Sequence, residues 1–259
     1  MQKFTYLQIL KSKKVLKVYL DKLAGEHNNP AFILSDPVQV PHRFNDPNDV
    51  EISGFLTSSI AWGQRTTIIT NAGRLMEGMG NSPYDFIMNF KDPDFVSFSN
   101  FNHRTFNPSD CFYFMKSLQN IYRNHGGLRT IFENTYCKTG CIADTIIEFR
   151  RIFFELPHQH RTEKHIPDIS KNSAAKRLNL FLMWMVRKDK SGVHFGLWEK
   201  IPMSTLYIPL DIHVARNARR LGLLKHKHND WKAVVELTMK LRELDPDDPV
   251  KYDFALFAH

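Results

Sequence analysis

The stretch that decides the fold is LDIHVARNARRLGLL, residues 210–224, which predicts a short amphipathic helix headed by Asp211. Its apolar residues recur at the spacing of a helix and form one predicted inward face: Val214, Ala215, Ala218 and Leu221. Gly222 is expected to end the helix. Aspartate is a favoured helix N-cap, and such a cap contributes roughly 1 kcal/mol. Asp211 therefore has a structural explanation that needs no catalytic role.

A second helix is expected at about residues 174–187, where the chain is apolar almost all round. Such a helix should pass through the centre of the protein. Lys176 lies at its start, 35 residues before Asp211. An amine is a nucleophile only when neutral, and both apolar surroundings and the positive end of a helix dipole disfavour the ammonium form. Lys176 is therefore a candidate for Schiff-base chemistry, although a lysine near a helix start is usually solvated.

Helical periodicity also dominates the rest of the chain, and no segment shows the alternation typical of a strand. The first helix is expected to stop at Gly25, and a loop rich in Pro, Asn and Asp follows it through Pro41. Asp46 and Asp230 are expected to head later helices. With about ten helices, no repeats and no low-complexity segment, the predicted class is all-α.

Length and composition limit the possible classes of protein. A chain of 259 residues with 42% apolar composition can bury a substantial core, and its length fits one large domain or two interleaved lobes. Lysines interrupt residues 1–30, so neither a signal peptide nor a membrane span is expected there. No later apolar run approaches the roughly 20 residues that cross a bilayer. The protein is therefore expected to be soluble and cytoplasmic.

The three cysteines, Cys111, Cys137 and Cys141, favour a reducing compartment over a disulfide framework. An iron–sulfur cluster held by four cysteines is excluded. A zinc site would have to recruit histidines such as His125 or His158, and ordinary thiols are the simpler interpretation. No metal ion or cofactor is expected.

The net charge of +8 and a pI near 9.3 suit a polyanionic partner. Lysine and arginine gain affinity for nucleic acid by releasing its condensed counterions. The charge alone favours a nucleic-acid partner only modestly over a basic protein that binds no nucleic acid.

Two segments together resemble the helix-hairpin-helix DNA glycosylase superfamily. In that superfamily an aspartate opens a helix of the form Asp-x-His-Val-x-Arg-x-x-x-Arg-Leu-Gly, and the matching residues here are Asp211, His213, Val214, Arg216, Arg220, Leu221 and Gly222. The segment AAKRLNLFLMWMV, residues 174–186, resembles the second hairpin helix, which begins with the catalytic lysine in bifunctional members. The resemblance assigns that place to Lys176.

Two further segments are similar to regions that contact the lesion in this superfamily. SGFLTSSIAWGQRTTIITNAGRLM, residues 53–76, resembles an early helix-turn-helix and places Trp62, Gln64 and Arg65 in its polar turn. DPDDPVKYDFALF, residues 245–257, resembles the C-terminal helix of the 8-oxoguanine branch and assigns Asp253 and Phe257 to the base pocket. A core position is an equally good explanation for Trp62.

The chain departs from the superfamily pattern at the hairpin, because the usual Gly-x-Gly before the lysine is absent from residues 166–173. Lys171, Asn172 and Ser173 are the predicted replacements for its DNA contacts, and Arg216 is a further predicted phosphate contact. The long interval between Lys176 and Asp211 and the absence of cluster cysteines are more similar to the archaeal 8-oxoguanine glycosylase branch. Bacterial relatives of that fold also suit the order of the segments.

The resemblance implies a two-lobed helical fold with a cleft between the lobes and a helix-hairpin-helix element. Residues 1–259 would form one compact unit, with residues 50–156 as one lobe and residues 1–49 and 157–259 as the lobe that carries the catalytic pair.

The implied activity is excision of an oxidised purine such as 8-oxoguanine from double-stranded DNA, followed by abasic-site cleavage, by a monomer. Lys176 would attack the sugar while Asp211 stabilises positive charge. Two alternatives remain: a non-catalytic nucleic-acid-binding protein of the same fold, and a structural all-α protein whose basic surface binds other partners.

Overall fold

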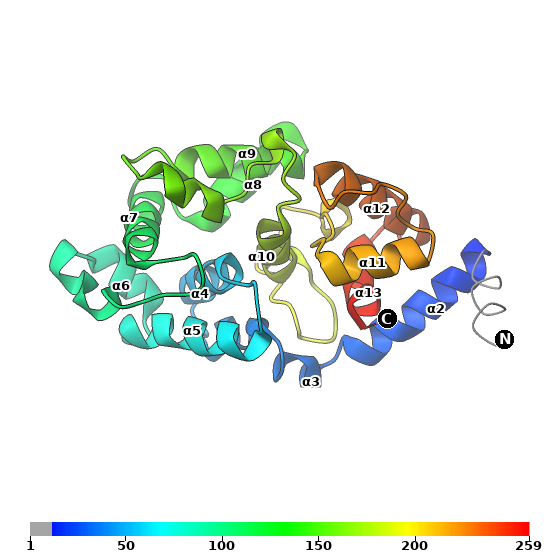
Figure 1. Cartoon of the computed structure of the whole chain (residues 1–259), viewed down its shortest axis with the longest axis horizontal. Helices are drawn as coiled ribbons and strands as arrows, with labels where there is room; N and C mark the ends of the chain where they lie inside the picture. Colours follow the sequence, from blue (N-terminus) through cyan, green and yellow to red (C-terminus); the bar gives the residue numbers. More distant parts are fainter. Residues whose placement is uncertain (1–11, 259) are drawn as a thin grey trace.

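The computed structural model describes residues 12–258, and these residues form an all-α protein (Figure 1). Helices account for 66% of the residues. No β-sheet occurs in the described part of the chain, where the extended segments form two isolated bridges, His103 with Phe106 and Ser173 with Asp230. The predicted all-α class is confirmed.

The helices follow one another through α2 to α13 with seven short 3₁₀ helices between them. The α-helices are α2 (Lys13–His27), α3 (Pro30–Ile33), α4 (Pro47–Ser59), α5 (Arg65–Gly78), α6 (Pro83–Asn89), α7 (Pro108–Asn124), α8 (Leu128–Thr139), α9 (Ile142–Phe153), α10 (Lys176–Val186), α11 (Ile212–Arg220), α12 (Trp231–Leu244) and α13 (Tyr252–Ala258). The 3₁₀ helices are η1 (Pro37–Gln39), η2 (Pro41–Arg43), η3 (Asp92–Phe98), η4 (His160–His165), η5 (Ile169–Lys171), η6 (Met203–Thr205) and η7 (Pro249–Lys251).

The expected boundary at Gly25 is wrong, because α2 continues through it to His27. A glycine inside a helix costs about 1 kcal/mol relative to alanine, and burial of the apolar face of α2 offsets such a cost. The loop expected through Pro41 instead contains α3, η1 and η2. Proline occupies the first turn of each of these short helices, where its missing N–H is not needed.

Three aspartates predicted to head helices occupy N-cap positions with side-chain cap bonds. Asp46 accepts hydrogen bonds from the first-turn amides of α4, and Asp230 accepts one from Ala233 N in α12. Asp211 accepts one from Val214 N at 2.8 Å, so α11 begins where the sequence predicted. The capping preference of aspartate thus located all three helix starts.

The apolar helix α10 packs inside the larger of two hydrophobic cores, as its composition predicted. Its side chains from Leu178 to Val186 are almost all buried there, and Phe181 contacts Phe55 of α4 edge to face. Close approach of α4 depends on Gly54, since a Cβ there would lie 3.0 Å from Met185 Cε. Because α10 is packed on several sides, its first residue, Lys176, is held in place.

The smaller core joins α2 to α11, α12 and α13, which lie together at one end of the molecule (Figure 1). Leu20 of α2, Ala215 of α11 and Leu237 of α12 are fully buried in it. Tyr207 and Trp231 pack against both cores. The end of α10 is tied to the start of η7 through Arg187, whose guanidinium pairs with Asp189 at 2.7 Å and with Asp248, the N-cap residue of η7, at 2.8 Å.

Within residues 12–258 no helix combines the length and the apolar character that a bilayer crossing requires.

Candidate functional site

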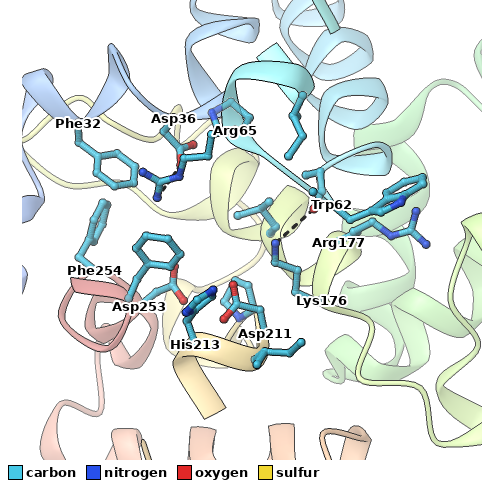
Figure 2. A pocket seen from close by; sticks show the side chains of 18 residues that line it. Phe32, Asp36, Trp62, Arg65, Lys176, Arg177, Asp211, His213, Asp253 and Phe254 are labelled. Atoms are coloured by element: carbon cyan, nitrogen blue, oxygen red, sulfur yellow. Dashed lines mark hydrogen bonds and ion pairs between the residues drawn. The ribbon is translucent and has the colours of Figure 1, made fainter. Parts of the chain in front are cut away.

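A cavity of about 750 Å³ opens where α3, α5, α10, α11 and α13 meet (Figure 2). This volume is in the range of small-molecule sites. Charged and aromatic side chains dominate its wall. The lining residues are Phe32, Asp36, Pro37, Ala61, Trp62, Gly63, Arg65, Ile68, Lys176, Arg177, Leu180, Pro209, Asp211, Ile212, His213, Asp253, Phe254 and Phe257.

Lys176 is the first residue of α10 and extends into this pocket (Figure 2). Its Nζ donates a hydrogen bond of 3.4 Å to the carbonyl oxygen of Ala61, in the segment between α4 and α5. The preceding residue, Ala175, has a left-handed backbone with φ of 47°. Non-glycine residues rarely adopt this conformation, which costs roughly 1–2 kcal/mol. The surrounding packing therefore holds the helix start, and with it the lysine, in place.

Asp211 combines its cap role with a position in the pocket wall. One carboxylate oxygen accepts the Val214 amide, and within the described residues the side chain forms no ion pair with Lys176. Lys176 and Asp211 therefore line one cavity without neutralising each other. A group placed between them can contact both.

The opposite side of the pocket is formed by Asp36 and Arg65, which make an ion pair of 3.8 Å. The guanidinium of Arg65 also lies 4.4 Å from the ring centroid of Phe257 and 5.9 Å from that of Phe32. Burial raises the pKa of Asp36, and the charges of Arg65 and Lys176 oppose that rise. Asp36 Oδ1 is held by the Val38 amide at 3.0 Å.

Asp253, in the first turn of α13, is the third carboxyl group of the pocket. Its Oδ1 is fully buried and has no hydrogen-bond partner among the described residues. Burial raises its pKa to about 8, and the negative charge of Asp211 adds to the rise while Lys176 opposes it. At neutral pH this group is therefore largely the uncharged acid.

Trp62 and Arg177 close the remaining side. The Arg177 guanidinium lies 4.5 Å from the Trp62 ring centroid and donates to the carbonyl oxygen of Ser59 at 2.6 Å. Burial lowers the pKa of Arg177 to about 10. The ring of His165 also stacks on Trp62, with centroids 5.9 Å apart, so Trp62 is packed against both His165 and Arg177. The turn itself needs Gly63, whose φ of 109° is disfavoured for residues with a side chain.

Six of the eleven predicted site residues line the pocket, and five do not. Those in the pocket are Lys176, Asp211, Trp62, Arg65, Asp253 and Phe257. Gln64 occupies the N-cap position of α5, with its side chain outside the pocket lining. Arg216 is exposed on α11, one turn beyond His213.

The three predicted hairpin contacts lie just before α10 and also fall outside the pocket lining. Asn172 is left-handed, with φ of 64°, and donates to the Asp230 carboxylate at 2.9 Å. Ser173 forms a backbone bridge with Asp230, and Lys171 is exposed. The segment before α10 is thus attached to the start of α12 through Asp230, and Lys171 is exposed.

Twelve of the lining residues lie outside the sequence-predicted set, and Phe32, Asp36, Arg177 and Phe254 are among them. Asp36 followed by Pro37 carries a recognisable N-cap pattern, but that pattern indicates only a helix start. Phe254 follows Asp253 directly and packs edge to face on Phe32, with centroids 5.0 Å apart. No local pattern connects these residues, because they come from segments far apart in the chain.

The three cysteines are free thiols, and Cys111 is buried. His125, one of the candidate zinc ligands, pairs with Glu155 at 2.7 Å. Across the described part of the chain, no group of three or more His, Cys, Asp or Glu side chains is arranged to hold a metal ion.

The model of a family described as a protein of unknown function, DUF2400, matches residues 36–259, so the chain belongs to this family. No curated protein matches the chain, and no solved structure matches it.

Proposed function

We propose that this protein is a DNA N-glycosylase with abasic-site lyase activity, which acts on an oxidised purine such as 8-oxoguanine in double-stranded DNA. The supporting observation is that Lys176 and Asp211 line one pocket. The lysine starts the buried helix α10, and the aspartate caps α11. In this proposal, the segment before α10 is the helix-hairpin-helix element of a two-lobed glycosylase fold, and the pocket is the cleft between its lobes.

The proposed reaction begins when the damaged nucleotide rotates out of the duplex into the pocket, because its sugar is inaccessible inside the stack. The neutral amine of Lys176 attacks C1′ as the bond from C1′ to the base breaks, and the base leaves with the electron pair and takes up a proton. The ionised carboxylate of Asp211 stabilises the positive charge that develops on the sugar.

The same amine accounts for the proposed lyase step. Opening of the sugar ring converts the amine adduct at C1′ into a protonated Schiff base, which makes the C2′ protons acidic. Loss of one C2′ proton and of the 3′ phosphate completes β-elimination, and water then releases the lysine. No metal ion or cofactor is needed for the atoms and charges of this sequence to balance.

DNA binding in this proposal relies on the basic surface. The net charge is +8, and both Lys171 and Arg216 are exposed and lie outside the pocket lining. Their contribution would be to phosphate affinity, which weakens with salt and carries no base specificity. We propose a monomer bound to one lesion.

Borohydride trapping tests the proposal, because borohydride reduces a lysine Schiff base to a stable covalent adduct. Wild type should be trapped on duplexes that contain 8-oxoguanine or an abasic site, and Lys176→Ala should give no adduct. Lys138→Ala is the matched control, since Lys138 is an exposed lysine of α8 outside the pocket lining. It should be trapped like wild type.

Other outcomes distinguish the alternatives. Salt-sensitive DNA binding without trapping would contradict the enzyme and support a non-catalytic nucleic-acid-binding protein. If wild type neither bound nor was trapped, nucleic acid would not be the partner. An adduct of undiminished yield in Lys176→Ala would show that another amine reacts.

A further inference from the structure

The pocket contains three carboxyl groups that differ in what they contact. Asp211 is bound to the Val214 amide, and Asp36 is bound to the Val38 amide and paired with Arg65. Both are therefore anchored before any ligand arrives. Asp253 differs from them, because its buried Oδ1 has no hydrogen-bond partner among residues 12–258.

A buried polar oxygen without a partner is uncommon and costs roughly 1–3 kcal/mol. The Asp253 side chain also lines the pocket, so rotation of its carboxyl group turns this oxygen towards a bound molecule. A ligand group that then completes the missing hydrogen bond removes the cost. The unpartnered oxygen of Asp253 thus indicates where a polar edge of a bound molecule is recognised.

The charges around Asp253 determine which form of the carboxyl group meets that ligand. Asp211 and Asp36 oppose its ionisation, whereas Lys176 and Arg187 favour it. Arg65 and His213 also line the pocket, and Arg65 is already engaged by Asp36. Burial has the largest effect, and together with the two negative neighbours it raises the pKa of Asp253 to about 8.

We propose that Asp253 is the specificity-determining residue of the pocket, and that its neutral carboxyl group forms two hydrogen bonds with an extruded base. The O–H donates to an acceptor of the base, and the other carboxyl oxygen accepts from an adjacent N–H. This inference rests on the proposed function.

The substrate class follows from the donor and acceptor pattern. An ionised carboxylate only accepts hydrogen bonds, so it would face a base carbonyl with two like-charged oxygens. A neutral acid presents one donor beside one acceptor, which matches the N–H and C=O of a cyclic amide. 8-Oxopurines carry this pattern on the oxidised five-membered ring, where the parent purine has only an acceptor. Asp253 therefore selects a base with an amide edge.

The test is binding of a duplex that carries 2′-fluoro-8-oxo-2′-deoxyguanosine, measured from pH 6 to pH 9.5. The fluorine disfavours positive charge on the sugar, so binding is observed without excision. Wild-type affinity should be constant up to pH 7 and fall by at least about tenfold by pH 9.5 as Asp253 ionises. Asp253→Asn keeps one donor and one acceptor but has no titrating proton, so that fall should disappear.

Asp253→Ala should bind at least about tenfold more weakly than wild type at pH 7. Wild type and Asp253→Asn bind the same ligand, so titration of the base affects both proteins equally and cancels from their comparison. A duplex with a tetrahydrofuran abasic analogue has no base, and all three proteins should bind it equally. Identical pH profiles for wild type and Asp253→Asn, or undiminished binding by Asp253→Ala, would overturn the inference.

Two measurements separate this inference from the proposed function. Borohydride trapping of wild type on an abasic duplex involves no base, so it tests the Lys176 amine independently of base recognition by Asp253. If wild type is trapped normally but the Asp253 variants bind the lesion as wild type does, only this inference is refuted. If wild type neither binds the lesion nor is trapped, both proposals are refuted. The ¹³C resonance of the Asp253 carboxyl in the unliganded protein should titrate near pH 8, and a midpoint below pH 6 would refute the neutral acid directly.

Discussion

Lys176 and Asp211 line the same pocket although 35 positions separate them in the chain, and each lies at the N-terminal end of its helix. The two helix starts therefore bring one amine and one carboxyl group, which are distant in sequence, into the wall of one cavity. The proposed chemistry needs both groups at one sugar.

The substitution Asp211→Asn separates the cap from the charge. Asparagine caps a helix as well as aspartate does, so the free energy of unfolding should change by less than about 0.5 kcal/mol. Loss of the carboxylate should lower single-turnover excision of 8-oxoguanine by on the order of 100-fold. Asp46→Asn, the same change at the N-cap of α4 outside the pocket lining, should leave both quantities unchanged. Full excision by Asp211→Asn would disprove the electrostatic role.

Stability should depend on pH through Asp253. The folded state holds this proton up to about pH 8, whereas an unfolded aspartate releases it near 3.8, so the folded state binds more protons between these values. Stability from this group is thus fully present below pH 3.8 and decreases as pH rises through 8. At pH 8.5 the free energy of unfolding of Asp253→Asn, measured with urea, should exceed that of wild type. The difference should be on the order of 2 kcal/mol after allowance for solvent screening. The difference should shrink towards pH 4, and a constant difference would argue against the titration.

His165 should remain neutral well below the usual range of histidine. Burial lowers its pKa to about 4, although the neighbouring Asp110 carboxylate, 3.1 Å from Nε2, opposes the shift. The ring proton resonances of His165 should therefore titrate with a midpoint near pH 4. Because its ring stacks on Trp62, the fluorescence of Trp62 should change over the same interval. A midpoint near 6.5 would show that the ring is solvated.

Two helical glycines should respond in opposite directions to a larger side chain, because Gly54 packs against α10 whereas Gly25 has open space beside it. Gly54→Val would press against Met185 and Phe181, and it should lower the free energy of unfolding by about 1–3 kcal/mol. Gly25→Ala in α2 has nothing within 4 Å of the added methyl group and should raise stability by up to about 1 kcal/mol. Urea unfolding of both variants checks the pair. Equal losses would contradict the packing described for α4 and α10.

The left-handed backbone of Ala175 makes it tolerant of glycine. Relief of the strained conformation offsets the entropy that glycine loses on folding, so Ala175→Gly should change stability by less than about 0.5 kcal/mol or raise it. Ala233→Gly, a matched change inside α12, should cost about 1 kcal/mol or more. A similar loss in both variants, measured by urea unfolding, would show that Ala175 is unstrained.

Local sequence patterns predicted the all-α class, the buried helix that Lys176 begins, and the cap at Asp211. Each depends on residues within about four positions of one another, because hydrogen bonding and side-chain spacing in a helix are local. The error at Gly25 has the same origin, since a weak local stop signal was overridden by packing of α2 against distant helices.

The sequence by itself thus determined the helices and placed Lys176 and Asp211 at helix starts, since capping and periodicity act over one turn. Only the tertiary structure decided what surrounds this pair. Asp36 and Arg65 join the pocket from segments far from α10 and α11, and Asp253 Oδ1 has no hydrogen-bond partner among the described residues there. Burial and electrostatic coupling depend on which segments meet in space, so the protonation and the availability of Asp253 could not be read from its neighbours in the chain.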